Sequence, residues 1–430
     1  MKFSDDFVRL VSIACGALLL LAAGVVVGAL YDPLVWPLRS IGKAGLVLIT
    51  EWRAVAGLKP TEHLEPLRLD LAAAPKTNVA KMQPGVTFVT GLFGEKLGAR
   101  LIGADGSVIY EWPIDFFDVM PEGKLYRFEA LIHGAHLFEN GDIVVNVDKK
   151  GMMRVSACGD ILWSNKSLTH HSIDVDDEGF IWAPRGPVRK SDPRLFPHPF
   201  FIDEIVRIDP ASGAEVEKFD LAEVYVDSGM PGRLTSLAKY FADTLHVNDV
   251  EVLDAADAAA FPNFSPGDIM ISSWQNSSIV VIDRRTKTIK WSVLGATQFQ
   301  HDPDFGPDGV ITVLDNRGWT PALKENNWLG DRGGSRIAAI RPGDDKAVTL
   351  YQSHSGDIFY TPRRGKHQRL PNGDILITET DAGRAFEVDQ KGEIVWSYLN
   401  KFDEDEVGWL MSADRYPPSY ADIGKSCPMD

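Results

Sequence analysis

The sequence has few cysteines. Only Cys15, Cys158 and Cys427 occur in 430 residues, too few for the disulfide framework that holds many small secreted domains together. No C-x-x-C pair and no Cys/His spacing indicates a zinc site. A single Cys158–Cys427 bridge would suit an extracytoplasmic domain, and two free thiols explain the sequence equally well.

Positive charge is also scarce. The formal net charge is −16, the isoelectric point is near 5.1, and no local cluster of Lys and Arg stands out. A surface of this kind repels a phosphate backbone. Nucleic acid is therefore not expected as a partner.

Charged side chains are missing altogether from residues 10–30, LVSIACGALLLLAAGVVVGAL. About 20 apolar residues in a helix span the hydrocarbon core of a bilayer. A cleaved signal peptide has a shorter apolar core of about 7–15 residues followed by a small-residue cleavage site, whereas this run continues into YDPLVWPLR. We therefore predict an uncleaved transmembrane anchor.

The anchor divides the chain into four predicted parts. These are a short cytoplasmic head (1–9), the transmembrane helix (10–30), a membrane-proximal stalk or interfacial helix (31–74) and a large domain (75–430). A short head before a large domain favours a cytoplasmic N-terminus and an exported domain. The predicted location is the bacterial inner membrane, with the large domain on the periplasmic side and within reach of membrane-protein partners.

The large domain contains a repeat. Aromatic residues make up 10% of the chain, with 38 Gly and 26 Pro, a mixture that favours many short strands and tight turns. A Gly turn followed by a strand that ends in Trp or another bulky residue occurs in six copies: DGSVIYEW (105–112), CGDILW (158–163), SGAEVEKFDL (212–221), TKTIKW (286–291), DKAVTLY (345–351) and KGEIVW (391–396). Such units are typical of propeller blades. The predicted fold is an all-β, six-bladed β-propeller, since a β-sandwich or two β domains would not repeat the strand-ending Trp.

Several histidines occupy one position of this repeat. His133, His171 and His301 each stand eight residues before the glycine of a turn. His246 joins them if the insertion that follows it is discounted, and His367 is a looser match. Equal offsets in different blades place side chains at equivalent points around the axis, so we expect these imidazoles to converge on the central channel.

Imidazole can act as nucleophile, acid or base near neutral pH. A single histidine in a propeller is ordinarily a hydrogen-bonded structural residue, but a repeated position argues for more than packing. Carboxylates stand nearby, as in His171-Ser-Ile-Asp174 and His301-Asp302, and could hold a divalent cation. They serve equally well to fix a histidine tautomer, and we predict no metal and no cofactor.

The ordered motifs of residues 85–420 resemble those of the arylsulfotransferase family of six-bladed propellers. The matching segments are HHSIDVDDEG (170–179), HVNDVEV (246–252), QHDPDFGPDGVITVLDN (300–316) and GKHQRLPNGDILITETDAGRAFEVDQKGEIVW (365–396). The resemblance implies that a channel histidine attacks the sulfur of an aryl sulfate to form a sulfohistidine. The sulfuryl group then passes to a phenol without a nucleotide donor.

By this resemblance His301 is the nucleophile, and His171 and His246 stabilise the phenolate or exchange protons with it. Asn248 is expected to hydrogen-bond a sulfuryl oxygen. The full set of substrate-binding candidates is Asn248, Trp274, Arg336, His133 and His367.

One segment departs from the family pattern. An arginine usually follows the His-x-Asn motif in an SSR arrangement, but this sequence reads Ser272-Ser273-Trp274. A guanidinium offers forked donors to a sulfate, whereas an indole offers one uncharged N–H. Arg317, Arg332 or Arg336 could supply the missing contact from another loop.

Three functions stay open from the sequence. The first is an arylsulfotransferase-like enzyme, with an aryl sulfate and a phenol as substrates. The second is a propeller that has diverged from catalysis and serves as a membrane-anchored ligand-binding or assembly module, with Trp274 as an aromatic platform. The third is metal-dependent hydrolysis or lyase chemistry at the same histidines.

Overall fold

The computed structural model of the chain describes residues 50–68, 71, 76–119, 126–197, 199–237, 243–318, 333–344, 346–354, 357–425 and 427. The predicted head, the predicted transmembrane segment and residues 31–49 of the predicted stalk lie outside the described residues. Among the residues that are described, no helix combines the length and apolar character needed to cross a bilayer.

The chain divides into two compact units, Met1–Glu62 and His63–Asp430. The described part of the first unit contains the short helix α3 (Trp52–Val55). The second unit contains the strands and is described by itself below.

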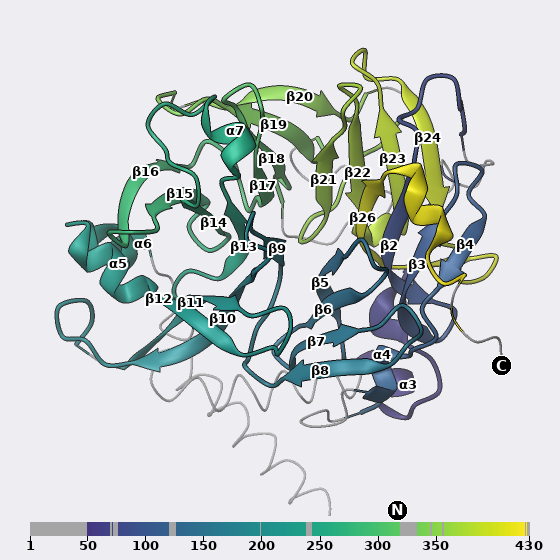
Figure 1. Ribbon diagram of the computed structural model, residues 1–430, viewed down its shortest axis with the longest axis horizontal. Helices are drawn as coiled ribbons and strands as arrows, with labels where there is room; N and C mark the ends of the chain where they lie inside the picture. The colour runs from purple at the N-terminus through teal and green to yellow at the C-terminus, as the bar shows by residue number, and fades with distance from the viewer. Residues whose placement is uncertain are drawn as a thin grey trace, which may run out of the picture. The chain divides into compact units, whose positions relative to one another are not determined.

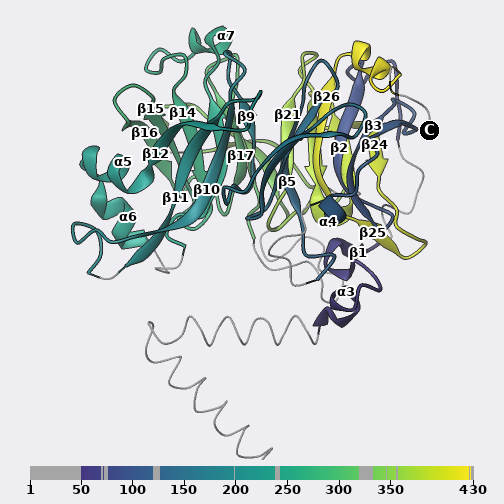
Figure 2. The same ribbon diagram turned by 60° about the horizontal axis from the view of Figure 1, so that its bottom comes forward.

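Six four-stranded antiparallel sheets form a ring in the second unit, with one strand of each next to the centre (Figures 1 and 2). From the centre outward, the six blades are β26-β2-β3-β4 (Leu410–Tyr416, Val86–Phe93, Lys96–Ile102, Val108–Glu111), β5-β6-β7-β8 (Ile132–Leu137, Ile143–Val147, Gly151–Val155, Ile161–Asn165), β9-β10-β11-β12 (Asp174–Val175, Ile181–Lys190, Phe200–Ile208, Glu215–Asp220), β13-β14-β15-β16 (Val247–Val252, Ile269–Ser273, Ser278–Asp283, Thr288–Leu294), β17-β18-β19-β20 (His301–Phe305, Ile311–Asp315, Arg336–Ile340, Val348–Gln352) and β21-β22-β23-β24 (Lys366–Arg369, Ile375–Glu379, Arg384–Val388, Ile394–Leu399). The predicted all-β, six-bladed propeller is confirmed.

Short elements complete the described part of this unit. A two-stranded pair joins β1 (Leu64–Pro66) to β25 (Glu406–Gly408). The helices are η1 (Thr61–His63, which begins at the end of the first unit), α4 (Phe116–Val119), α5 (Leu221–Asp227), α6 (Pro231–Leu237), α7 (Ala255–Ala258), η4 (Thr380–Ala382) and η5 (Pro418–Asp422).

The C-terminal strand closes the ring. β26 pairs with β2, with Val86 opposite Tyr416, and the hydroxyls of Thr90 and Ser412 lie 2.8 Å apart across this pair. The innermost strand of the first blade therefore comes from the other end of the propeller sequence. The pairing completes the first blade, and the propeller leaves only short strand edges.

Three strand-ending tryptophans of the repeat each tie a blade to its neighbour. The indole Nε1 of Trp112 donates to Gly141 O at 3.1 Å, that of Trp163 to Pro210 O at 2.8 Å, and that of Trp396 to Ala104 O at 2.9 Å. Each acceptor lies in a turn of the adjacent blade. A large apolar side chain with one donor suits a position that is packed on one side and polar at its tip.

Glycine turns set the register of the innermost strands. Gly141, Gly179, Gly267, Gly309 and Gly373 lie between the first and second strands of five blades and have φ values from 72° to 88°. This left-handed conformation favours glycine because a Cβ is strained there. Since the same turn recurs, a residue at a fixed distance before the glycine reaches the same height on the innermost strand.

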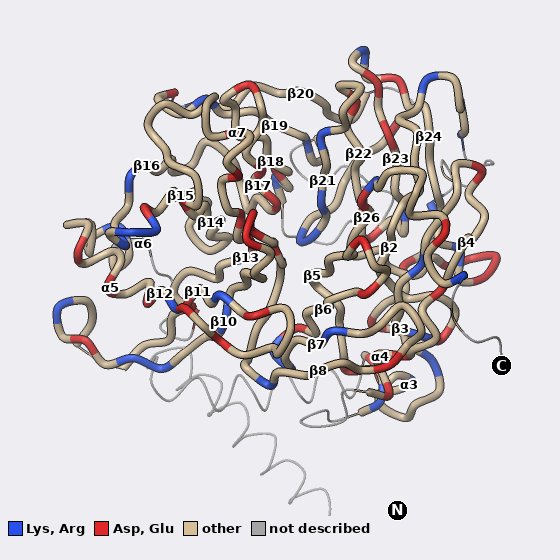
Figure 3. The backbone as a smooth tube through the Cα atoms, in the orientation of Figure 1, with Lys and Arg blue, Asp and Glu red and all other residues tan. Residues whose placement is uncertain are grey.

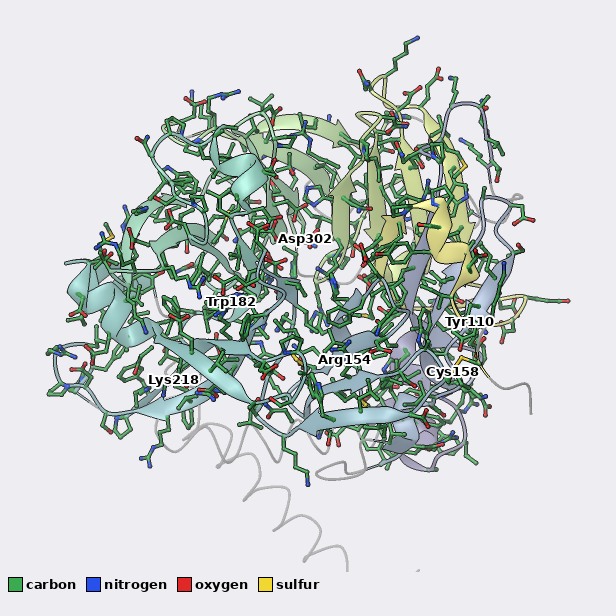
Figure 4. The ribbon with its side chains drawn as sticks, in the orientation of Figure 1. Tyr110, Arg154, Cys158, Trp182, Lys218 and Asp302 are labelled. Atoms are coloured by element: carbon green, nitrogen blue, oxygen red, sulfur yellow. A yellow bond between two sulfur atoms is a disulfide. The ribbon has the colours of Figure 1, made fainter. Side chains whose placement is uncertain are left out.

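A disulfide joins Cys158 to Cys427, with 5.4 Å between their Cα atoms. Cys158, labelled in Figure 4, lies in the turn between β7 and β8. The bridge fastens the segment after the closing strand to the next blade around the ring. Of the two thiol states compatible with the sequence, the structure contains the bridge.

Candidate functional site

The innermost strands of the six blades surround a small cavity of about 10 Å³ in the central channel. Every blade contributes to its wall at a similar height. The lining residues are His133, Ser172, Asn248, Asp249, His301, Asp302, Gly365, Lys366 and Met411. The equal offsets along the sequence thus correspond to one layer of side chains.

Three of the predicted histidines form a continuous row of rings. The centroids of His133 and His171 lie 4.0 Å apart, and those of His171 and His246 lie 5.0 Å apart. The row extends to Trp274, 5.4 Å from His246. His171 and His246 have φ values of 56° and 51°, a strained conformation for non-glycine residues that is common at functional sites.

His301 is held in one tautomer. Its Nδ1 lies 2.8 Å from Asn316 Oδ1, and the Asn316 amide is oriented because its Nδ2 donates to Thr361 O at 2.6 Å and to Arg364 O at 2.8 Å. An oxygen facing the ring requires the proton on Nδ1, so the lone pair is on Nε2. Burial lowers the pKa of His301 to about 3, against the opposing effect of the Asn316 hydrogen bond, and the ring is neutral at pH 7.

His246 differs from His301 in that its pKa is raised. Its Nδ1 lies 2.5 Å from Asp243 Oδ2, and its backbone N–H donates to Asp243 Oδ1 at 3.1 Å. Burial by itself would lower the pKa of His246, but the hydrogen bond and charge of Asp243 outweigh burial and raise the pKa above its ordinary value. With Nδ1–H directed at Asp243, the second proton of the imidazolium is on Nε2.

His171 lies at the end of a buried chain of hydrogen bonds. Asp203 Oδ1 is 3.2 Å from His170 Nε2, and His170 Nδ1 is 2.8 Å from His171 Nδ1. A His170 that donates to Asp203 accepts from His171 Nδ1–H, which leaves a lone pair on His171 Nε2. Burial and the neighbouring imidazoles hold the pKa of His171 well below its ordinary range, so this nitrogen is a proton acceptor.

His133 completes the row beside Asp148. Its Nδ1 lies 3.8 Å from Asp148 Oδ1, and burial lowers the pKa of His133. The cluster therefore contains three histidines whose pKa is lowered and one, His246, whose pKa is raised. Environments that separate titratable groups in this way are typical of sites that use an acid and a base together.

Farther along the innermost strands, carboxylates surround Lys366. Lys366 Nζ lies 2.9 Å from Asp302 Oδ1, and Figure 4 places Asp302 near the centre of the ring. Burial and neighbouring carboxylates raise the pKa of Asp249, Glu251 and Asp304 well above the usual value. Acidic residues on β13 and β17 and basic residues on β21 lie beside the channel (Figure 3). Lys366 serves this group as its internal counter-ion.

Two sets of side chains have metal-ligand spacing among the described residues. They are His133, Asp148 and His171, and Asp302, Asp304 and His367, each with one atom per residue within 4.8 Å of the others. In both sets a histidine nitrogen is already hydrogen-bonded: His171 to His170, and His367 to Asp302 and Thr312. A cation at the second set would have to displace contacts to both nitrogens of His367, whereas His171 keeps a free Nε2.

The other sequence candidates differ in placement. Asn248 lines the cavity and donates from Nδ2 to Gln300 O at 2.7 Å, which leaves one amide proton for a ligand. His367 is buried between Asp302 Oδ2 and Thr312 Oγ1, at 3.0 and 2.8 Å, and does not line the cavity.

Of the arginine candidates, Arg317 and Arg336 do not line the cavity. Arg336 is on β19, the third strand of its blade, and binds Asp315 Oδ2 at 2.8 Å and Thr349 Oγ1 at 2.9 Å. Arg332 lies outside the described residues. The backbone N–H of Arg317 donates to Gln298 O at 3.0 Å.

Sequence reasoning assigned no role to several residues that orient the site. Asn316 ends the QHDPDFGPDGVITVLDN motif, and His170 is the first member of the His-His pair that opens another motif, so both were visible as polar residues in matched segments. Asp243 and Asp203 lie outside the motifs. Asp243 is three residues before His246, whereas the fold brings Asp203 to His170.

Fold and site together define a six-bladed propeller with a cluster of histidines at its central channel. The pKa is lowered for three of these histidines and raised for one. A family model described as arylsulfotransferase (ASST) matches residues 134–401. The chain belongs to the arylsulfotransferase (ASST) family. Membership suggests aryl sulfotransferase-like activity, with aryl sulfates and phenols as substrates. A search of curated proteins finds no significant match.

Several solved structures are similar in fold. A protein of unknown function from Bacteroides caccae is 13% identical, with 77% of this chain and 98% of that chain covered and a TM-score of 0.48. Virginiamycin B lyase from Staphylococcus aureus is 13% identical, with 81% and 98% covered and a TM-score of 0.43. Hydrazine synthase from Kuenenia stuttgartiensis is 10% identical, with 68% and 71% covered and a TM-score of 0.39.

Proposed function

We propose that the protein transfers a sulfuryl group from an aryl sulfate to a phenol through a covalent intermediate on His301. The observation that carries the proposal is the fixed tautomer of His301. Its Nδ1–H is held by Asn316 Oδ1 at 2.8 Å, and the neutral ring presents a nucleophilic Nε2 within the histidine-lined channel. A neutral imidazole with an oriented lone pair meets the requirement for nucleophilic catalysis.

In the first half of the reaction, the Nε2 lone pair of His301 forms a bond to sulfur while the bond from sulfur to the aryl oxygen breaks. The electron pair of that bond stays with the aryl oxygen. His246 gives its Nε2 proton to this oxygen, and a phenol leaves. The raised pKa of His246 suits a group that must hold a proton until the bond breaks.

The second half returns every group to its starting state. An acceptor phenol gives its proton to the now neutral His246, and its oxygen bonds to sulfur as the nitrogen–sulfur bond breaks. The electron pair returns to His301 Nε2. The single hydroxyl proton of the phenol goes to His246, and the ring of His171, 5.0 Å from that of His246 between centroids, lies beside this transfer.

We also propose that the propeller is anchored to the bacterial inner membrane by residues 10–30 and faces the periplasm. The length and apolar character of that segment support this placement. The Cys158–Cys427 disulfide supports an oxidising compartment, because such bridges form and persist there.

The test of this function is a transfer assay with 4-nitrophenyl sulfate as donor and phenol as acceptor. We expect release of 4-nitrophenol to depend on the acceptor, with phenyl sulfate formed in equal amount and parallel lines in double-reciprocal plots. Release without transfer, or no turnover by folded protein, would contradict the proposal.

The pH dependence tests the role of His246. For donors with weakly acidic leaving phenols, the rate requires protonated His246, so activity is present below its pKa and is lost as pH rises through it. Asp243→Asn removes the hydrogen bond and the charge, burial then lowers the pKa, and we expect the descending limb to move down by about 1–2 pH units. The measurement is kcat/KM against pH for phenyl sulfate.

4-Nitrophenyl sulfate is the matched control, because its leaving group needs little help from an acid. The limb for this donor is expected to respond weakly to Asp243→Asn. Equal shifts for both donors, or no shift for phenyl sulfate, would assign the acid to another group.

A further inference from the structure

Arg364 differs from the other basic residues around the channel in how few hydrogen bonds its guanidinium makes. Its closest ion-pair contact, to Asp381 Oδ1, is 3.7 Å long, beyond hydrogen-bond distance. Its Cζ lies 4.1 Å from the ring centroid of Trp409, and the side chain is 19% exposed. Within the described part of the chain, the guanidinium has no acceptor at hydrogen-bond distance.

Two other basic residues considered for the site are paired. Arg336 contacts Asp315 and Thr349, and Lys366 contacts Asp302. Polar groups that are largely removed from water normally have partners, since leaving donors unused costs free energy. A guanidinium with five N–H donors and no close protein acceptor suits an anion that arrives with a ligand.

The backbone places Arg364 at the edge of the cavity. It directly precedes Gly365 and Lys366, which line the cavity, and its carbonyl accepts the Asn316 Nδ2 that orients His301. Trp409, beneath its guanidinium, is two residues before the lining residue Met411. The charge of Arg364 also contributes to the lowered pKa of His133, after burial.

Each of the six blades contributes one residue to the group around the channel. Around the ring, one such residue lies on each innermost strand or at most three residues before it, and the ring closes between the blade of Arg364 and the blade of Trp409. In order around the channel, these residues are His133, His171, His246, His301, Arg364 and Trp409.

We propose that Arg364 binds the sulfuryl oxygens of the donor and holds the sulfur beside His301 Nε2. The identity of the ligand rests on the function proposed above. The segment Ser272-Ser273-Trp274 presents an indole where a guanidinium was expected, and Arg364 supplies the forked donors from a different blade. It makes and breaks no bond, and it meets the negative charge of the sulfuryl group throughout the transfer.

The experiment measures binding separately from turnover. 4-Methylbenzenesulfonate has the sulfonyl oxygens of an aryl sulfate but a carbon–sulfur bond that cannot be transferred. In a His301→Asn background, Arg364→Met is expected to weaken its binding by about 10- to 100-fold in calorimetry, with Arg364→Lys in between. Binding of 4-methylphenol, which has no anionic group, is expected to stay within about twofold.

Arg154→Met is the matched control. Arg154 is similarly buried, at 17% exposed, and lies over an aromatic ring, 4.4 Å from the centroid of Phe138. It is paired, however, with Asp142 at 2.8 Å and Pro210 O at 2.9 Å, so its loss should leave sulfonate binding unchanged.

The outcomes separate this inference from the proposed reaction. Sulfonate binding that depends on Arg364 in a protein without transferase activity would uphold the anion site and remove the reaction. Transferase activity with sulfonate binding indifferent to Arg364→Met would overturn the anion site and keep the reaction. Loss of sulfonate and 4-methylphenol binding together would show a collapsed channel and also count against a specific anion contact.

Discussion

Replacement of His301 by asparagine is expected to lower kcat/KM for 4-nitrophenyl sulfate by about 10³-fold or more. Asparagine keeps a similar reach and a polar tip, but it has no nucleophilic nitrogen. The wild-type protein, mixed with donor and quenched before acceptor is added, should carry one sulfuryl group on the peptide that contains residue 301. The variant should carry none by mass spectrometry.

The control for this change is His354→Asn. His354 is an exposed histidine at the outer edge of its blade, bridged to Asp357 and far from the innermost strands. Its replacement should leave kcat/KM within about twofold. If His301→Asn retained turnover, or if the sulfuryl group were found on another histidine, the assignment of the nucleophile would be wrong.

The architecture could be predicted from the sequence because the residues that recur in the repeat make the same structural contacts or adopt the same backbone conformation in different blades. Trp112, Trp163 and Trp396 recur since each indole bridges to a turn of the next blade. The glycine turns recur because their φ is positive in five blades. Six units follow from the six copies of the strand that ends in Trp or another bulky residue, and this count does not depend on knowing how the blades pack.

The height of the histidines was predictable for the same reason. A constant turn makes an offset of eight residues equivalent to a position on the innermost strand, and His133, His171 and His301 share it. His246 breaks the offset because a segment containing α7 is inserted between its strand and the turn at Gly267.

Protonation states were not predictable, because they depend on hydrogen-bond partners that the repeat does not specify and on how those partners are oriented. Asp203 reaches His170 from β11, and Asn316 is oriented by carbonyls at Thr361 and Arg364 in the next blade. His246 and His301 occupy similar positions in the repeat, but their pKa values shift in opposite directions. The ring of His246 faces the carboxylate of Asp243, whereas the ring of His301 faces the amide of Asn316. No periodicity within a blade encodes that difference.

Arg364 was not predicted from the sequence. Arg336 was one of the arginines expected to replace the missing contact, yet its donors are used by Asp315 and Thr349 within its own blade. Arg364 is adjacent to the matched segment that begins at Gly365 and was passed over. Its guanidinium becomes a candidate only when the ion pairs of its neighbours are known.

Asn316→Leu is expected to lower kcat/KM by about 10- to 100-fold, because the residue positions His301 through its tautomer. Without the Oδ1 acceptor, the His301 proton can move to Nε2 and remove the lone pair from the reacting side. The two carbonyls that lose the amide keep hydroxyl donors, Ser335 Oγ at 3.2 Å from Thr361 O and Thr361 Oγ1 at 2.9 Å from Arg364 O, so folding should be preserved.

Asn400→Leu provides the matched control. Asn400 is also buried and also bridges two carbonyls, Leu92 O at 2.7 Å and Gly408 O at 2.9 Å, but these contacts involve no imidazole. Its loss should affect the thermal midpoint more than the rate. The ¹⁵N shifts of His301 give a readout that a purely structural role would not move, with the Nδ1–H form dominant in wild type and reduced in Asn316→Leu.

Asn316→Asp distinguishes tautomer control from simple packing. A carboxylate still accepts from Nδ1–H and keeps Nε2 free, but its charge raises the pKa of His301 from about 3. Because attack requires the neutral ring, activity should persist at high pH and fall as pH drops through the raised value, a limb that wild type shows only in stronger acid. An Asn316→Asp profile parallel to that of Asn316→Leu, low at every pH, would mean that the amide acts on the site by some route other than the proton of His301.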